Sequence, residues 1–221
     1  MITVPEATKQ IIERSRYLVE ALSKDLINYS SLARYIKPEL EKMLFKDVSE
    51  ASIIMAIKRL SDEIKPKFAP LDIFVSTPEM IVRSNLVELT YTNSENLRNK
   101  YKLLSEVYSS ESKYYFTLTE GVFETAIIVS KDLGEQVKNA LSGEKVVSEM
   151  IDLSAITIKL PKGNVETPGV YYFFLKSLAW EGINIIEIVS TPNEVSIILE
   201  DENVNNAFGI LKGLFPIKNL T

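Results

Sequence analysis

The chain has 221 residues and a formal net charge of −5, and its 46% hydrophobic and 25% charged residues are typical of a globular protein with sizeable cores. It contains no cysteine and no histidine, which excludes disulfides, thiol nucleophiles, zinc sites built on these residues and imidazole acid–base chemistry. No apolar run approaches the roughly 20 residues that cross a bilayer, and the first residues lack a signal-peptide pattern, so we expect a cytoplasmic protein without a membrane span.

Residues 1–67 have the pattern of three helices separated by short breaks. The first is expected from Pro5 to Ser23, because its apolar residues recur with a period of about 3.6. The second begins near Ser30, and Pro38 predicts that it is kinked or divided. The third follows an N-cap at Ser49 and places its isoleucines on one face.

A β-prone stretch, D-I-F-V-S-T-P-E-M-I-V-R, follows these helices and suggests the two strands of a wing, Ile73–Ser76 and Met80–Arg83. Three helices followed by a wing predict a winged-helix-like domain over residues 1–83. In that fold the third helix enters the DNA major groove. The candidate DNA-binding residues are Arg34, Lys37, Ser49, Ser52, Lys58 and Arg59.

Charge gives this DNA-binding interpretation weak support. Residues 1–67 carry 12 Lys and Arg against 10 Asp and Glu, whereas the remaining residues carry 13 against 20. Glu50 and Asp62 oppose it, as does the lack of Arg, Lys, Asn or Gln in the first two turns of the third helix, since these side chains usually read bases. Winged helices also bind proteins, so DNA binding and protein interaction both remain open.

Residues 84–153 predict a β-α-β-β-α-β unit of the ferredoxin-like kind. Its expected parts are a strand at Ser84–Thr92, a helix capped by Asn93 or Ser94, a hairpin of Lys113–Thr119 and Phe123–Val129, a helix at Leu133–Leu141 and a strand at Lys145–Leu153. Its first loop lacks a glycine. We therefore expect this copy to be degenerate, with a structural or pairing role.

Residues 154–221 repeat the same order, which indicates an internal duplication of about 70 residues. The expected parts are a strand at Ala155–Leu160, the loop P-K-G-N-V-E-T, an apolar helix from Gly169 to Gly182, a hairpin around Thr191-Pro192-Asn193 and the helix V-N-N-A-F-G-I-L-K-G-L-F. The last segment, Phe215–Thr221, is short and contains Pro216. We expect it to leave the final strand incomplete, with a neighbour completing that edge.

Two stretches of this second copy, E-T-P-G-V and E-G-I-N-I-I-E-I-V-S-T-P-N-E-V-S-I, resemble the ACT domain, and most closely the ACT repeats of aspartokinases. The motif likeness covers about residues 154–215, and residues 84–152 match only by element order. The resemblance implies an α+β chain with two ferredoxin-like ACT repeats. It also implies that an amino acid binds in the loop between the first strand and the first helix.

The expected ligand site is the start of the apolar helix. Gly169 allows a ligand to approach the backbone, and the free N–H groups of the first turn suit a carboxylate. By the resemblance, Glu166 occupies the acidic position that pairs with an ammonium group. The candidate ligand-binding residues are Glu166, Thr167, Pro168, Gly169, Val170, Asn184, Ile185, Ser190 and Thr191. The alternative is that the repeats serve dimerisation alone.

The sequence thus predicts a regulatory protein that senses an amino acid or a similar small molecule, with no catalytic residues, metal or cofactor. The first hypothesis is a DNA-binding regulator that forms a homodimer through its ACT repeats. The alternative is a regulatory subunit that docks onto an amino-acid biosynthetic enzyme. An enzyme with a helical mutase-like head is disfavoured, because Arg14, Arg16 and Arg34 show no converging pattern.

Overall fold

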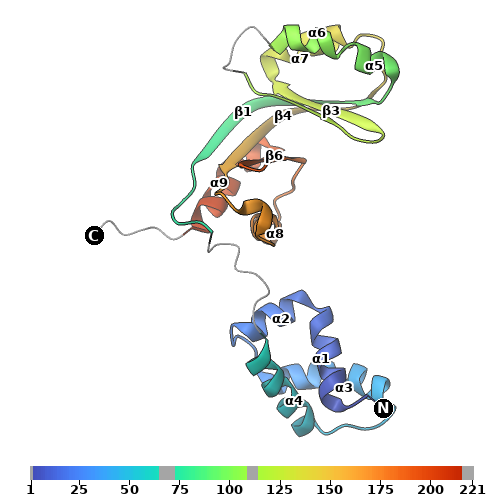
Figure 1. Ribbon diagram of the computed structural model, residues 1–221, viewed down its shortest axis with the longest axis vertical. Helices are drawn as coiled ribbons and strands as arrows, with labels where there is room; N and C mark the ends of the chain where they lie inside the picture. The colour runs from blue at the N-terminus through green and yellow to red at the C-terminus, as the bar shows by residue number, and fades with distance from the viewer. Residues whose placement is uncertain (1, 65–72, 109–113, 216–221) are drawn as a thin grey trace, which may run out of the picture. The chain divides into compact units, whose positions relative to one another are not determined.

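The computed structural model describes residues 2–64, 73–108 and 114–215, and the chain divides into two compact units, Met1–Ala69 and Pro70–Thr221 (Figure 1). Within the described residues, no helix is long and apolar enough to cross a membrane.

The described residues of the first unit form four helices where the sequence predicted three. They are α1 (Val4–Arg14), α2 (Arg16–Ser23), α3 (Tyr29–Leu44) and α4 (Glu50–Glu63). The first expected helix is divided at Ser15, whose backbone is extended. Helix α3 continues through Pro38. It begins at Tyr29, close to the expected start near Ser30, and its N-cap is Asn28. The predicted N-cap at Ser49 is confirmed.

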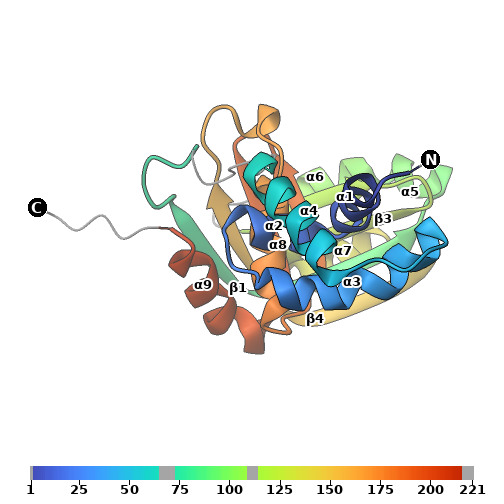
Figure 2. The same cartoon turned by 90° about the horizontal axis from the view of Figure 1, so that it is seen from below.

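One apolar core holds this first unit together. Helices α1, α3 and α4 contact one another (Figure 1 and Figure 2). Ile12, Leu22, Ile36 and Ile57 are at most 1% exposed and belong to the same cluster. The division at Ser15 lets α1 and α2 both contribute to this core, and burial on both sides of Pro38 accounts for the uninterrupted α3.

The second unit is an α+β structure, as the sequence predicted. Its strands are β1 (Met80–Thr92), β2 (Phe116–Glu120), β3 (Glu124–Ser130), β4 (Val146–Lys159), β5 (Glu187–Thr191) and β6 (Glu194–Glu200). Its helices are α5 (Glu95–Asn99), α6 (Tyr101–Tyr108), α7 (Lys131–Ala140), α8 (Val170–Trp180) and α9 (Val204–Gly213), with short 3₁₀ helices η1 (Asn164–Glu166) and η2 (Asp201–Asn203).

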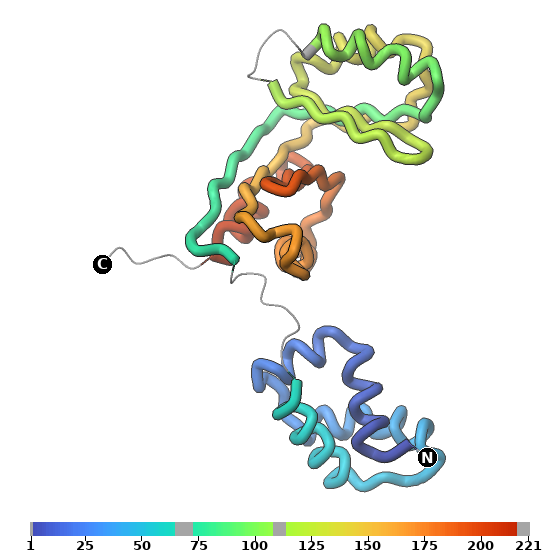
Figure 3. The backbone as a smooth tube through the Cα atoms, in the orientation of Figure 1, coloured from blue at the N-terminus to red at the C-terminus, as the bar shows by residue number. Residues whose placement is uncertain are grey.

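The six strands form one antiparallel sheet in the order β2-β3-β1-β4-β6-β5. Strands β1 and β4 are long and run through both halves of the sheet (Figure 3). We call the two halves lobe 1 and lobe 2. Lobe 1 contains residues 86–92 of β1, residues 146–152 of β4, β2, β3 and α5–α7. Lobe 2 contains residues 80–83, residues 153–159, β5, β6, α8 and α9.

Both long strands change conformation where the lobes meet. The pairing of β1 with β4 is interrupted between Arg83 and Leu86 and again after Leu86. Asn85 and Asp152, which lie at these interruptions, have φ angles of 58° and 56°. Asn and Asp tolerate this left-handed conformation better than most residues do. The paired bulges bend the two strands and so allow one sheet to serve two lobes.

The predicted wing is wrong. Met80 pairs with Ile158 and Arg83 pairs with Ala155, so the expected second wing strand belongs to the sheet of lobe 2. The expected first wing strand is not a strand, and Phe74 packs against the core of lobe 2. Residues Met80–Arg83 of this run instead pair with β4.

This strand also explains the missing end of the second repeat. Residues 80–83 take the place beside β4 that a final strand would occupy, so lobe 2 is completed by a segment preceding lobe 1 in the chain. Phe215 joins the core of lobe 2, and residues 216–221 lie outside the described residues. The expected boundaries after residues 83 and 153 therefore fall inside β1 and β4, and the first unit ends at Ala69.

Helices cover one face of the sheet in each lobe. In lobe 1, alternate residues of β1 such as Leu89 pack against α5, α6 and α7. In lobe 2, Ile156 of β4 and Phe174 of α8 share a core with α9. A third cluster combines the opposite faces of both lobes and includes Ile128 of β3 and Ile198 of β6. The uncovered sheet faces of the two lobes therefore face each other.

Candidate functional site

A cavity of about 570 Å³ lies in lobe 2, where the segment before α8 meets the turn between β5 and β6. Five residues that the sequence singled out line it, namely Thr167, Gly169, Val170, Ser190 and Thr191. They come from two segments about 20 residues apart in the chain, which the antiparallel pairing of β5, β6 and β4 brings together.

The start of helix α8 forms one wall of this cavity. Gly169 is its N-cap, with φ 89° and ψ 2°, and no side chain caps the helix. The first backbone bond of the helix runs from the N–H of Phe173 to the carbonyl of Gly169 at 3.0 Å. The N–H groups of Val170 and Tyr171 precede it and have no partner within the helix. They provide a site for a carboxylate or another anion.

Asn164 provides a second polar group in the same cavity. Asn164 is the first residue of η1, lines the cavity and is only 5% exposed. Its Oδ1 atom has no hydrogen-bond partner among the described residues. A buried acceptor left unpaired costs about 1–3 kcal/mol. This oxygen is therefore suited to accept a hydrogen bond from a bound N–H or ammonium group.

Four predicted ligand residues do not line the cavity. Glu166, Pro168 and Asn184 are exposed, and Ile185 packs against the core of lobe 2. The polar acceptor that the cavity does contain is Asn164, within the quoted loop but not singled out there. Nothing in the sequence distinguishes it from an exposed loop asparagine, because its burial depends on the η1 turn and on the β5–β6 turn.

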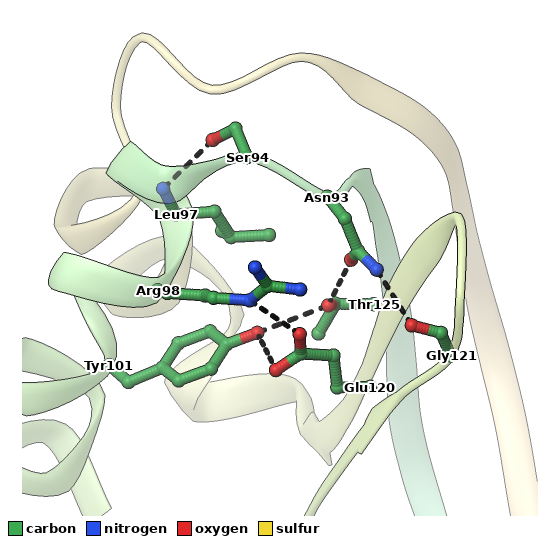
Figure 4. A network of polar contacts seen from close by, with 8 residues as sticks. All are labelled: Asn93, Ser94, Leu97, Arg98, Tyr101, Glu120, Gly121 and Thr125. Atoms are coloured by element: carbon green, nitrogen blue, oxygen red, sulfur yellow. Dashed lines mark hydrogen bonds and ion pairs between the residues drawn. The ribbon is translucent and has the colours of Figure 1, made fainter.

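The equivalent junction in lobe 1 is closed by its own side chains (Figure 4). Ser94 caps α5 by accepting a hydrogen bond from the N–H of Leu97 at 2.9 Å. Asn93 donates through Nδ2 to the carbonyl of Gly121 at 2.7 Å, and its Oδ1 accepts from the hydroxyl of Thr125 at 2.6 Å. The polar groups of this loop are thus already paired.

An ion pair completes the closure of lobe 1. The Nε atom of Arg98 lies 2.6 Å from a carboxylate oxygen of Glu120, and the hydroxyl of Tyr101 donates to the other oxygen at 3.0 Å. The bond from Arg98 and then that from Tyr101 lower the pKa of Glu120. Figure 4 shows these side chains between the start of α5 and the β2–β3 hairpin. The start of α5 therefore has a capping side chain, which the start of α8 lacks.

The predicted DNA-binding residues lie on α3 and α4 of the first unit. Arg34 donates to the hydroxyl of Ser31, and Lys37 forms an ion pair with Glu41 at 3.7 Å. The hydroxyls of Ser49 and Ser52 bond to each other within the cap of α4. Lys58 and Arg59 are exposed on the same helix.

The arrangement of the acidic side chains indicates whether they can hold a metal ion. Across the described parts of the chain, no group of three or more Asp or Glu residues is arranged to hold a metal ion.

The fold resembles that of known protein structures. No protein-family model and no curated protein matches the sequence. The ligand-free regulatory subunit of aspartate kinase from Thermus thermophilus matches with a TM-score of 0.52 and 18% identity, over 63% of this chain and 99% of that chain. The regulatory subunit from Thermus flavus matches with a TM-score of 0.50 and 16% identity, over 62% and 97%.

A longer protein matches as well. Aspartate kinase from Synechocystis gives a TM-score of 0.52 at 16% identity, and the likeness covers 79% of this chain but 33% of that enzyme. Identities this low establish fold and not activity. The ACT-repeat resemblance read from the sequence is thereby confirmed in three dimensions: the chain contains the fold of aspartate kinase regulatory subunits.

Proposed function

We propose that this chain is a regulatory protein that senses an α-amino acid through the cavity at the start of α8. One observation carries the proposal, namely that the uncapped start of α8 lines a cavity together with Asn164, whose side-chain oxygen is buried and unpaired among the described residues. The cavity volume of about 570 Å³ falls within the range of roughly 300–1,000 Å³ common for small-molecule sites.

The two polar groups match the two charged ends of an amino acid. The ligand carboxylate accepts hydrogen bonds from the first-turn N–H groups of α8, where the helix dipole favours negative charge. The ligand ammonium donates to Oδ1 of Asn164. Ser190 and Thr191 border the cavity from the β5–β6 side and supply hydroxyls for a polar ligand side chain.

A thermal-shift screen of the whole chain against the twenty amino acids tests this assignment. A ligand at a hundredfold excess over its Kd stabilises the protein by about 2.7 kcal/mol. Asn164→Leu should abolish that shift, whereas Asn184→Leu and Glu166→Gln should retain it because neither side chain lines the cavity. Loss of the shift in Glu166→Gln but not in Asn164→Leu would contradict the proposal.

We propose further that the first unit transmits the signal by docking onto a protein, an enzyme of amino-acid biosynthesis being the favoured partner. Phe45 is 94% exposed, and Tyr17, Tyr35 and Met55 are also exposed on this unit. Exposed large apolar side chains favour a protein partner over DNA. The wing that supported DNA binding is absent, because its second strand belongs to lobe 2.

Two measurements separate a protein partner from DNA. An enzyme that copurifies from the native host and is lost in Phe45→Ser, with amino-acid binding intact, supports docking. Salt-sensitive retardation of genomic DNA fragments, weakened by Lys58→Ala and Arg59→Ala, would instead favour the DNA-binding regulator.

The proposed assembly is a homodimer formed through the sheet. Strands β2 and β5 are the two edges of the six-stranded sheet, and exposed edges invite pairing with another chain. Ile188 on β5 is 41% exposed. Light scattering coupled to size exclusion measures the mass of the full chain, and a lysine substitution at Ile188 should favour the monomer if β5 is the pairing edge.

A further inference from the structure

Two glutamates face the same space between the lobes. Glu88 of β1 lies opposite Ile128 of β3, and Glu187 of β5 lies opposite Ile198 of β6. Directly opposed residues on neighbouring antiparallel strands point to the same face of a sheet. Ile128 and Ile198 belong to the apolar cluster that joins the two lobes, so both carboxylates lie on the inter-lobe face.

The Glu88 carboxylate is buried and only half paired. The residue is 9% exposed. The hydroxyl of Thr90 donates to its Oε1 at 3.2 Å, while Oε2 has no partner among the described residues. Burial raises the pKa of Glu88, and the bond from Thr90 lowers it in part. An unpaired carboxylate oxygen in such a place needs a positive charge or a proton.

The carboxylate of Glu187 increases this need for a positive charge or a proton. Burial raises the pKa of Glu187, the negative charge of Glu88 raises it further, and a bond from the hydroxyl of Thr119 lowers it. No lysine or arginine of the described residues is among the groups that shift either pKa. Within the described residues, neither carboxylate forms an ion pair with a lysine or arginine.

Three threonine hydroxyls lie on the same sheet face of lobe 1 as Glu88. Thr117 lies opposite Ile128 on the other side from Glu88, and its buried Oγ1 has no partner among the described residues. Thr90 and Thr119 both lie opposite Ala126 on this face. Together these residues present carboxylate and hydroxyl oxygens from both lobes.

We propose that Glu88 and Glu187, with the hydroxyls of Thr90, Thr117 and Thr119, hold a hard metal cation between the two lobes. Oxygen-only ligands suit Ca²⁺ and Mg²⁺, and two carboxylates match a divalent charge. The cation links β1 of lobe 1 to β5 of lobe 2. This site lies on the opposite face of the sheet from α8, so it is separate from the amino-acid cavity.

The test uses the full chain after treatment with a chelator. Melting is followed while CaCl₂ or MgCl₂ is added, with choline chloride holding the ionic strength constant and NaCl and KCl in parallel. The wild-type chain should melt about 5–10 °C higher at a hundredfold excess of cation over its Kd. Equilibrium dialysis should find one cation per chain.

Three isosteric variants separate this site from general charge effects. Glu88→Gln and Glu187→Gln should lose the cation-dependent shift, and Glu88→Gln should melt above the wild type in metal-free buffer because a buried charge is removed. The matched control is Glu124→Gln, an exposed glutamate on β3 of the same sheet, and it should keep the full shift.

Three outcomes would overturn the proposal. The first is a wild-type melting temperature that no cation changes. The second is a shift that persists undiminished in both Glu88→Gln and Glu187→Gln. The third is a stability that depends on pH through these two residues but on no cation, which would show that the pair holds a proton instead.

Discussion

In lobe 1 the junction between the first strand and the first helix is closed by its own side chains, whereas the same junction in lobe 2 is open. Ser94 caps α5 in lobe 1, and Asn93 is bonded through both ends of its amide. In lobe 2 Gly169 leaves α8 uncapped, and the oxygen of Asn164 is buried and unpaired. The same topology therefore has a capped helix and a bonded asparagine in lobe 1, but an uncapped helix and an unpaired asparagine oxygen in lobe 2.

This difference shows where a duplicated fold can differ in function. Both lobes place an asparagine in the loop before the helix, but only in lobe 1 do Thr125, Glu120 and Gly121 supply partners for the surrounding polar groups. An unpaired polar atom and a cavity therefore distinguish lobe 2, where we propose the ligand site, from lobe 1.

The largest expected effect is at Thr125, the centre of the closed junction. Its side chain is fully buried, and its hydroxyl bonds to Asn93 and Tyr101. Thr125→Val should lower the free energy of unfolding by about 1–3 kcal/mol, because it removes the hydrogen bonds of a fully buried hydroxyl. Thr191→Val at the exposed junction of lobe 2 should change it by less than about 0.5 kcal/mol. Equal losses in urea titrations would remove the proposed difference between the lobes.

A slightly smaller effect is expected at Gly169, which lobe 2 uses where lobe 1 has a capping side chain. Its φ of 89° disfavours any residue with a Cβ atom, so Gly169→Ala should cost about 1–2 kcal/mol. Gly209→Ala within α9, where a Cβ meets no atom within 4 Å, should instead add about 1 kcal/mol. Urea titration measures both, and the same sign for the two variants would contradict this explanation.

The cap of α5 should have the next largest effect. Ser94→Ala removes the acceptor for the Leu97 N–H and should cost about 1 kcal/mol. Ser105→Ala, in the exposed part of α6, is the control and should be nearly neutral. A Ser94→Ala variant that gains amino-acid binding in lobe 1 would show that the cap alone keeps this junction closed.

The smallest expected effect is on the pH dependence of stability, which has opposite signs at Glu120 and at the pair Glu88 and Glu187. The pKa of Glu120 is lowered by Arg98 first and then by Tyr101, so its stabilising contribution is present above the ordinary value of 4.5 and is lost as the pH falls below it. The pKa values of Glu88 and Glu187 are raised by burial, so in metal-free buffer their protonation adds stability as the pH falls toward 4.5.

Urea titrations between pH 3 and 8 should therefore show a stability maximum at mildly acidic pH. Glu88→Gln should reduce the loss of stability as the pH rises above the maximum. Glu120→Gln should reduce the loss of stability as the pH falls below it. Unchanged profiles in both variants would indicate that these carboxyls do not control the pH dependence.

Local patterns in the sequence were sufficient to identify most elements of the second unit. Partial alternation of apolar residues predicted β6, and residue composition predicted β1. The Pro-Gly before α8 predicted that helix, and the repeated order of elements predicted the duplication. The Ser49 and Ser94 caps depend on contacts within three residues, which is why they were predictable. Five of the nine predicted ligand residues line the cavity for the same reason: they lie in two short, recognisable turns.

The sequence by itself determined the α+β class, the repeated order of elements and the position of the loop at Gly169, because these follow from periodicity and turn chemistry. Only the tertiary structure decided that residues 80–83 join lobe 2 and not a wing, since a β-prone run pairs with whichever strand has a free side. It also decided that Asn164 and not Glu166 lines the cavity, and that Glu88 and Glu187 share one space. Burial and pairing between distant segments set these outcomes, and no local pattern encodes them.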